Sequence, residues 1–378
     1  MGAFHAYDIR GIYNVDFDKD TAYKVGYFLP ELLSADKVLV GRDARVSSDE
    51  IHDYLLKGLT DAGADVYDAG LCTTPMVYFG TAHYGFKASV QITASHNPAE
   101  YNGMKVSREN ALPVGYDTGL GQIKEWIESG RECVPAEKKG VVHQIDVKKD
   151  YLPFLLKYKG DWSGLKIAMD VSNGMASLFV REIFGDQPTY IYEDMDGRFP
   201  NHEPNPLVPA NVEDLKKLVA QTKADIGIIF DGDADRVMFV DENSRFISPD
   251  LMIAVLGHYF LEERGEKGYI HQDIRSSKAV GEYLAPMGGV MNTWRVGRAY
   301  AALKLRELDG VFGGELAGHY YFRDFYYSDS GLLAAILITN VVAKMKAQGV
   351  SLSQLIARIE KYQNSGEINF RVEDKKGA

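Results

Sequence analysis

Short apolar runs alternate with helical patterns along this chain, and this alternation constrains the fold more than any other feature. Each apolar run ends at turn residues, as a strand does where it leaves a buried sheet. The runs cover residues 37–40, 89–92, 166–170 and 225–230. Apolar residues recur at helical spacing between and after them: Ile123, Trp126 and Ile127; Val212, Leu215 and Leu218; and Leu352, Leu355, Ile356 and Ile359. The alternation predicts an α/β fold in which helices cover mixed or parallel sheets.

The length of the chain bounds the number of domains. With 378 residues it is too long for one ordinary hydrophobic core, so we expect two to three domains. Hydrophobic residues make up 46% of the chain and charged residues 25%, which indicates a globular protein rather than a disordered one. Composition alone indicates breaks at the charged residues 137–140 and near residues 364–366.

Charge and apolar patterning exclude several classes of function. The formal net charge of −11 argues against nucleic-acid binding, which needs a basic face. The most apolar stretch, residues 332–343, is too short to span a bilayer and predicts a buried helix. Because the first residues run straight into a motif, we expect no signal peptide. The two cysteines, Cys72 and Cys133, suit a reducing compartment, so we expect a cytoplasmic protein with no membrane or nucleic-acid partner.

Two loops carry the residues of a phosphoryl-transfer site. The segment at residues 93–98, Thr-Ala-Ser-His-Asn-Pro, places the hydroxyl of Ser95 beside His96 on a turn. A serine hydroxyl is a weak nucleophile that needs a neighbouring base and a metal to manage charge. Directly after the apolar run 225–230, carboxylates stand at alternate positions, at Asp231, Asp233 and Asp235. Side chains so spaced on an exposed loop can turn towards one point, and hard oxygen donors suit Mg²⁺.

Other interpretations of these loops are possible. An EF-hand calcium loop could begin at Asp231, because Glu242 stands at its twelfth position. That interpretation fails because Arg236 occupies the position that demands glycine, and the flanks of the loop are strand-like rather than helical. A serine in an ordinary Asn-Pro turn and a solvated acidic turn are the simpler alternatives.

The two loops, in this order and at this spacing, resemble those of the phosphohexomutase family, the phosphomannomutases and phosphoglucomutases. The resemblance runs from end to end and includes an amino-terminal signature, segments around the serine loop and a sugar-recognition loop. The matching segments are residues 6–11 (Ala-Tyr-Asp-Ile-Arg-Gly), 41–43 (Gly-Arg-Asp), 73–75 (Thr-Thr-Pro), 101–105 (Tyr-Asn-Gly-Met-Lys), 196–206 and 313–319 (Gly-Gly-Glu-Leu-Ala-Gly-His).

The resemblance implies three consecutive domains of mixed α/β sheet, with a fourth domain absent or truncated. We place a phosphoserine-loop domain at residues 1–145 and a metal-binding domain at residues 146–250, ending at a turn formed by Pro249 and Asp250. A sugar-recognition domain follows at residues 251–365. Residues 366–378 then resemble the start of the truncated fourth domain.

The resemblance also implies the reaction and the roles of the site residues. It implies a hexose 6-phosphate and hexose 1-phosphate mutase with Mg²⁺ and a hexose 1,6-bisphosphate activator. Small sugar phosphates are the expected partners, and a monomer or homodimer the expected state. The implied catalytic residues are Ser95 as the phosphorylated group, His96, Lys105, Arg10 and Arg236; the implied metal ligands are Ser95, Asp231, Asp233 and Asp235; and the implied substrate-binding residues are Arg275, Arg298, Glu315 and His319.

The chain departs from the family pattern at two positions. Ala317 stands where a serine binds a sugar hydroxyl, and Arg298 stands where many members have a histidine. Arginine cannot give up its proton, so we expect Arg298 to clamp a phosphate. The alternatives are a phosphoglucosamine mutase or a catalytically impaired sugar-phosphate-binding protein. We expect His202 to be structural and His271 to be a surface histidine or a buried one with satisfied hydrogen bonds.

Overall fold

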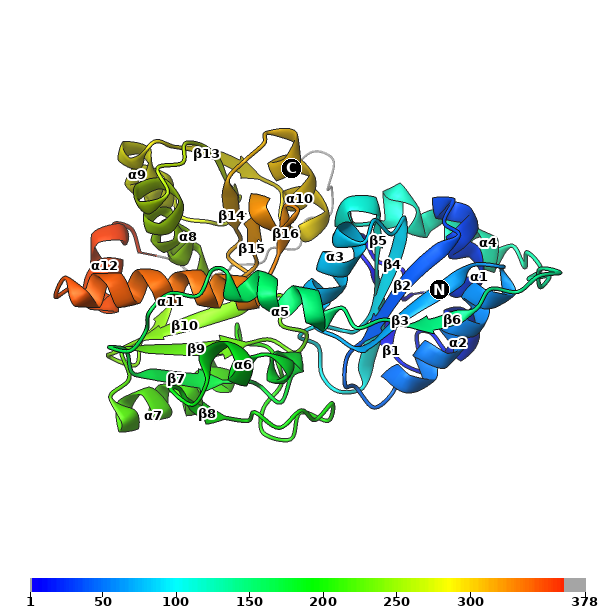
Figure 1. The fold of residues 1–378 in the computed structure, drawn as a ribbon, viewed down its shortest axis with the longest axis horizontal. Helices are drawn as coiled ribbons and strands as arrows, with labels where there is room; N and C mark the ends of the chain where they lie inside the picture. Colours follow the sequence, from blue (N-terminus) through cyan, green and yellow to red (C-terminus); the bar gives the residue numbers. More distant parts are fainter. Residues whose placement is uncertain (1, 364–378) are drawn as a thin grey trace, which may run out of the picture.

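The computed structural model describes residues 2–363, which form three successive units, each a sheet with helices packed on it (Figure 1). The sheets contain six, five and five strands. Each sheet combines parallel and antiparallel pairs, so the prediction of mixed sheets covered by helices is confirmed. The expected truncated fourth domain at residues 366–378 lies outside the described residues.

The first sheet carries the serine loop. Its strand order is β1-β5-β4-β2-β3-β6, antiparallel from β1 to β4 and parallel from β4 to β6. The strands are β1 (Ile9–Ile12), β2 (Lys37–Arg42), β3 (Asp65–Leu71), β4 (Ala88–Ile92), β5 (Tyr101–Arg108) and β6 (Val142–Gln144), and the helices are α1 (Lys19–Leu33), α2 (Ser48–Asp61), α3 (Thr74–His83) and α4 (Leu120–Glu128). The charged break at residues 137–140 lies in the irregular connection between α4 and β6.

The second sheet carries the aspartate loop. Its strand order is β11-β10-β9-β7-β8, with parallel pairs on the β7 side and antiparallel pairs on the β10 side. Its elements are α5 (Lys148–Leu156), β7 (Ile167–Asp170), α6 (Val180–Phe184), β8 (Thr189–Ile191), α7 (Glu213–Thr222), β9 (Ile226–Phe230), β10 (Val237–Asp241) and β11 (Phe246–Ile247). Because β9 and β10 flank the aspartates, the rejection of an EF-hand is confirmed.

The third sheet has the order β13-β12-β14-β15-β16. It changes from parallel to antiparallel at β14. The expected turn at Pro249 and Asp250 is wrong, since these residues begin a helix whose first turn tolerates proline. The elements are α8 (Pro249–Gly257), β12 (Gly268–Asp273), α9 (Lys278–Leu284), β13 (Gly289–Trp294), α10 (Arg298–Glu307), β14 (Phe312–Gly314), β15 (Tyr320–Phe322), β16 (Ser328–Asp329), α11 (Gly331–Ala347) and α12 (Leu352–Ile359).

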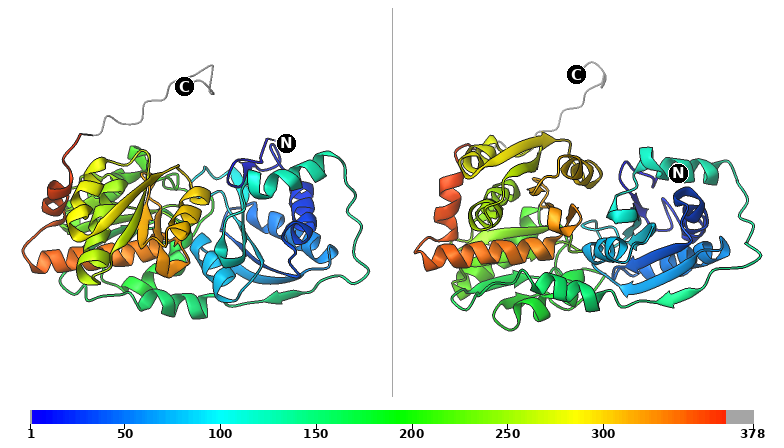
Figure 2. Two further views of the ribbon diagram at one scale, coloured as in Figure 1. Left: turned by 90° about the horizontal axis from the view of Figure 1, so that it is seen from above. Right: turned by 45° about the horizontal axis from the view of Figure 1, so that its top comes forward.

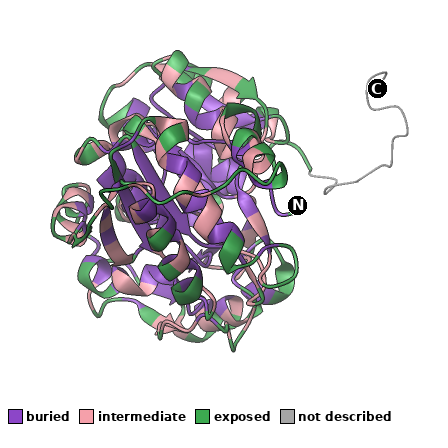
Figure 3. Ribbon diagram, turned by 90° about the vertical axis from the view of Figure 1, so that its right-hand side faces the viewer, coloured by how far each residue is buried: buried purple, intermediate pink, exposed green. Residues whose placement is uncertain are grey.

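Helix α11 joins the second and third units into one core. It runs between their sheets, packing against β9 and β10 on one side and α8 on the other (Figure 1). Its apolar side chains are buried all around the helix, which confirms the expected buried helix at residues 332–343. The first unit lies beside this pair (Figure 2), and buried residues are concentrated in the strands and on the inner faces of the helices (Figure 3).

No single helix within residues 2–363 has both the length and the apolar composition to cross a membrane. Helices α11 and α12 meet the test only as a pair, bent by 102°.

Candidate active site

The serine and aspartate loops meet where the first unit faces the second. Ser95 lies on the turn after β4, and residues 231–236 connect β9 to β10. The Ser95 hydroxyl donates a hydrogen bond to a carboxylate oxygen of Asp231 at 3.0 Å. A Cβ at Gly232 would stand 2.4 Å from the carbonyl oxygen of Ser95. Only glycine therefore allows the two loops to approach so closely.

The backbone of the serine loop is held in an uncommon conformation by one buried arginine. Ser95 has a φ of 52°, in the left-handed region that non-glycine residues rarely occupy. The guanidinium of Arg45 donates to the carbonyl oxygens of Ser95, at 2.9 Å, and of Asn97, at 2.7 Å. Sequence reasoning missed Arg45, although its position two residues after the Gly-Arg-Asp segment was a usable signal.

The aspartates of the second loop are buried, so the expectation of an exposed loop is wrong. Asp231, Asp233 and Asp235 are at most 1% exposed. Lys105 compensates part of their charge: its ammonium lies 2.7 Å from Asp233 and 2.6 Å from Asp235. The hydroxyl of Thr74 donates a further hydrogen bond to Asp233.

The three carboxylates fit a divalent cation. One oxygen from each lies within 4.8 Å of the others. The Oδ1 atoms of Asp233 and Asp235, which Lys105 does not contact, are buried and have no hydrogen-bond partner among the described residues. A compact set of hard oxygen donors with unused lone pairs matches the preference of Mg²⁺.

His96, which follows the serine, is surrounded by cations. The nearby Arg236 guanidinium, burial, and the charges of Arg10 and Lys105 hold its pKa well below 6.5. The ring is therefore neutral at neutral pH. Its Nδ1 atom is buried and has no hydrogen-bond partner in the described part of the chain.

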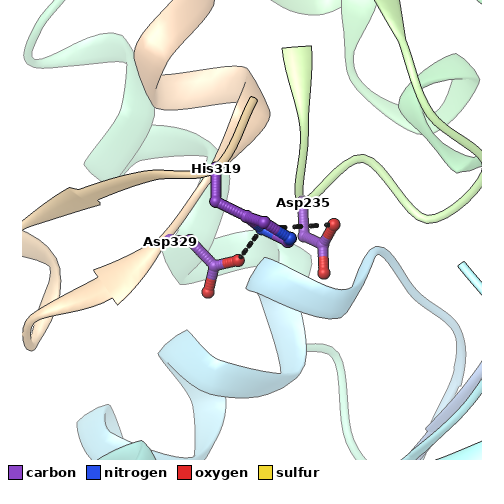
Figure 4. Close-up of side chains that lie close together, drawn as sticks. All are labelled: Asp235, His319 and Asp329. Carbon is purple, nitrogen blue, oxygen red and sulfur yellow. Dashed lines mark hydrogen bonds and ion pairs between the residues drawn. The ribbon is translucent and has the colours of Figure 1, made fainter. Parts of the chain in front are cut away.

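The second and third units are joined through Arg236 and His319. The Arg236 side chain donates to Nε2 of His319 at 2.9 Å, and the two residues form an isolated antiparallel bridge. The other ring nitrogen of His319 lies 2.6 Å from Asp329 and 3.8 Å from Asp235 (Figure 4). Sequence reasoning did not identify Asp329, because a single aspartate at a strand end carries no motif.

The guanidinium of Arg298 already makes several contacts within the protein, whereas a phosphate clamp would have its donors free for a ligand. Its guanidinium lies 3.1 Å from Asp329 and donates to the carbonyl oxygen of Ala111 at 2.9 Å. It also stacks 3.6 Å above the ring of Tyr78. Its role as a clamp stays a prediction.

One cavity of about 330 Å³ brings together most of the predicted residues. It lies between the first and third units, beside the aspartate loop. Ser95 and His96 are not among its lining residues. Arg275 does line it, but its guanidinium is paired with Asp273. The predicted site residues that line the cavity are Arg10, Lys105, Asp235, Arg236, Arg275, Arg298, Glu315 and His319, together with Ala317.

The two histidines outside the site differ from each other. His202 joins Asp170, at 3.1 Å, to the backbone oxygen of Glu203, at 2.8 Å, as a structural residue does. His271 is not a surface histidine, because it is 1% exposed; its ring lies beside the side chain of Asn292. Burial lowers its pKa to about 4, so this ring is neutral.

Comparison with known proteins identifies the family. The models of alpha/beta/alpha domains I, II and III of phosphoglucomutase/phosphomannomutase match residues 1–132, 149–244 and 248–362. The chain belongs to the phosphoglucomutase/phosphomannomutase family. It is therefore an enzyme of the intramolecular phosphotransferase type.

Individual relatives agree with this assignment. The chain is 37% identical to a protein named phosphohexose mutases from Xanthomonas campestris, over 100% of this chain and 85% of that protein. It is 36% identical to a phosphomannomutase from Escherichia coli, over 98% of this chain and 84% of that one. A crystal structure of a phosphoglucomutase/phosphomannomutase family protein from Burkholderia thailandensis is 30% identical, with a TM-score of 0.85 over 95% of this chain and 80% of that one.

Proposed function

We propose that this member of the family interconverts hexose 6-phosphates and hexose 1-phosphates of mannose or glucose, with phosphorylated Ser95 as the donor and a hexose 1,6-bisphosphate as the intermediate. The contact between the Ser95 hydroxyl and Asp231 supports this proposal, because Asp231 belongs to a buried carboxylate cluster that could hold a metal ion. The name phosphomannomutase of several relatives supports the choice of sugar.

Asp231, Asp233 and Asp235 are the residues that would hold Mg²⁺. When bound, the ion would neutralise charge on the phosphoryl group next to Ser95. Lys105 now contacts two of these carboxylates. In the loaded enzyme its ammonium would be free to face the transferring phosphoryl group.

The protein contributes positive charge along the path of the phosphoryl group. Transfer breaks the bond between phosphorus and the Ser95 oxygen and forms one to a sugar hydroxyl oxygen, whose proton must go to a base. Arg10, Lys105 and Arg236 line the cavity and stabilise the negative charge. His96 is adjacent to Ser95, but the cations that lower its pKa disfavour its protonation. The carboxylate of Glu315 lines the cavity and burial raises its pKa, so it can accept the proton.

The sugar itself would lie against the 313–319 segment. Glu315 is buried, and one of its oxygens accepts from the backbone of Gly297 at 3.0 Å and from the Tyr321 hydroxyl at 3.1 Å. These contacts orient its carboxylate towards the cavity that it lines, where it can accept from sugar hydroxyls. Ala317 offers no hydroxyl, so Glu315 would make the principal contact.

Incubation with glucose 1,6-bisphosphate or mannose 1,6-bisphosphate tests the proposal. Intact mass and peptide mapping should show one phosphoryl group, on Ser95, and none in Ser95→Ala. A phosphoryl group on another residue, or none on the folded wild type, would sink the assignment. Parallel assays with the 1-phosphates of mannose, glucose and glucosamine then define the sugar; preference for glucosamine 1-phosphate would favour the phosphoglucosamine mutase alternative.

A further inference from the structure

Each carboxylate oxygen of Asp329 contacts a different residue of the candidate site. It is fully buried at the end of β16. One oxygen lies 2.6 Å from Nδ1 of His319, and the other lies 3.1 Å from Nε of Arg298. The two partners come from different elements of the third unit, and both line the cavity.

The partners of His319 define its tautomer. A carboxylate can only accept, so Nδ1 must carry the proton that faces Asp329. Arg236 can only donate, so Nε2 must present its lone pair to that guanidinium. Asp329, His319 and Arg236 therefore form a chain of hydrogen bonds in which the donor and the acceptor are defined at each link.

We propose that Asp329 is a positioning residue of this enzyme, which sets the His319 tautomer and at the same time anchors Arg298 above Tyr78. The inference rests on the proposed function, in which Arg236 and Arg298 face the phosphorylated sugar. No sequence motif assigns this role to Asp329. Its carboxylate does not line the cavity, so it acts through the two residues that do.

The same side chains could be interpreted as a second cation site, since oxygens or nitrogens of Asp235, His319 and Asp329 lie within 4.8 Å of one another (Figure 4). Two guanidinium groups already neutralise this cluster, because Arg298 contacts Asp329 and Arg236 contacts His319. The ring nitrogen that faces Asp329 carries a proton. Positioning explains these contacts more simply than metal binding does.

An isosteric amide cannot replace this carboxylate. In Asp329→Asn the new side chain would have one oxygen and one amide donor, whereas both partners of Asp329 are donors. The oxygen should turn to Arg298, because hydrogen bonds from charged donors are the stronger ones. The amide would then donate to Nδ1 of His319, and the proton would move to Nε2, opposite the Arg236 donor.

Nitrogen-15 NMR of the imidazole rings tests the inference directly. Wild-type His319 should show a protonated Nδ1, and Asp329→Asn should show a protonated Nε2 or a mixture of tautomers. In the same variant kcat/KM for mannose 1-phosphate should fall about 10- to 100-fold. Asp324→Asn is the matched control, because Asp324 also pairs with an arginine, Arg264, but lies outside the cavity.

A second variant keeps the test valid if the first folds poorly. When Arg298→Gln is combined with Asp329→Asn, the introduced glutamine oxygen can accept from the introduced asparagine amide. The asparagine oxygen can then again accept from Nδ1 of His319. In this double variant His319 should return to its wild-type tautomer, while the cavity still lacks the guanidinium of Arg298.

Three outcomes decide between the inference and the proposed function. Unchanged His319 nitrogen shifts in Asp329→Asn would overturn the inference, and so would wild-type turnover in that variant. If Ser95 takes no phosphoryl group while the tautomer still changes, the proposed function fails and the coupling stands.

Discussion

At the scale of single residues, the site is a set of buried charges whose members are not equivalent. Burial and the charges of Asp233 and Asp235 raise the pKa of Asp231 well above its usual value. Burial and Asp235 act in the same direction on Asp233, but the contact with Lys105 outweighs them and its pKa is lowered. In the metal-free protein, the ionised form of Asp231 therefore destabilises the fold, whereas the ionised form of Asp233 stabilises it.

Neutralising these two aspartates should have opposite effects on stability without metal. Asp231→Asn should raise the free energy of unfolding by on the order of 1 kcal/mol, because it removes an unfavourable charge. Asp233→Asn should lower it by about 3 kcal/mol, because Lys105 loses one of its two partners. Denaturant unfolding in chelator checks both, and adding Mg²⁺ should stabilise the wild type more than either variant. Equal shifts of the same sign would contradict this account.

At the scale of elements, the site depends on loops at strand ends that touch through backbone atoms. Gly232 packs against the serine loop, and Gly197 packs against the backbone of Ala44 and Arg45, in the segment that holds that loop. Such contacts leave no room for a side chain, so loop spacing is set by glycine.

Gly232→Ala should separate the serine and aspartate loops. A Cβ placed 2.4 Å from a carbonyl oxygen forces a backbone shift, which should cost about 1–3 kcal/mol of stability. Phosphorylation of Ser95 by the bisphosphate should slow at least tenfold. Gly164→Ala is the control, since a Cβ there meets nothing within 4 Å; an equal effect in both variants would argue against loop contact as the cause.

The connection before α7 is anchored to β7 by a charged pair that should make stability depend on pH. Burial lowers the pKa of His202, but the hydrogen bond to Asp170 outweighs it and the pKa is raised above 6.5. A raised pKa means that the stabilisation is complete below about pH 6.5 and is lost as pH rises through the folded-state value.

Unfolding of the wild type and of His202→Gln between about pH 5.5 and pH 8.5 checks this dependence. The stability difference should be largest at the acidic end and should shrink towards the alkaline end. His143→Gln, which changes a half-exposed histidine on β6, is the matched control. A difference that grows with pH would have the wrong sign.

At the scale of the whole molecule, the three units are connected by the charges of the site itself. Lys105 links the first unit to the second, Arg236 links the second to the third, and Arg298 links the third to the first through the carbonyl oxygen of Ala111. Binding of a cation or a phosphate at these groups must therefore change how the units hold together.

Lys105→Met should show this coupling. Removing the ammonium leaves Asp233 and Asp235 buried without their cation, so the metal-free protein should lose about 3–5 kcal/mol. In the proposed site Lys105 would compete with Mg²⁺ for these oxygens, so the variant should bind Mg²⁺ more tightly, by about tenfold, while losing turnover. Thermal unfolding in chelator and in Mg²⁺, with the exposed Lys217→Met as control, measures both effects; a smaller Mg²⁺-induced shift than in the wild type would contradict them.

The sequence by itself determined the alternation of strands and helices, the buried α11 and the two loops that carry the reactive groups. These follow from local periodicity and turn chemistry, which a linear chain displays directly. Only the tertiary structure decided that the aspartates are buried, that Lys105 contacts two of them, that Arg45 binds the serine loop, and that Asp329 contacts His319 and Arg298. Burial and charge pairing arise between segments far apart in the chain, such as residues 105 and 233, and no local pattern encodes which partner a charge will meet.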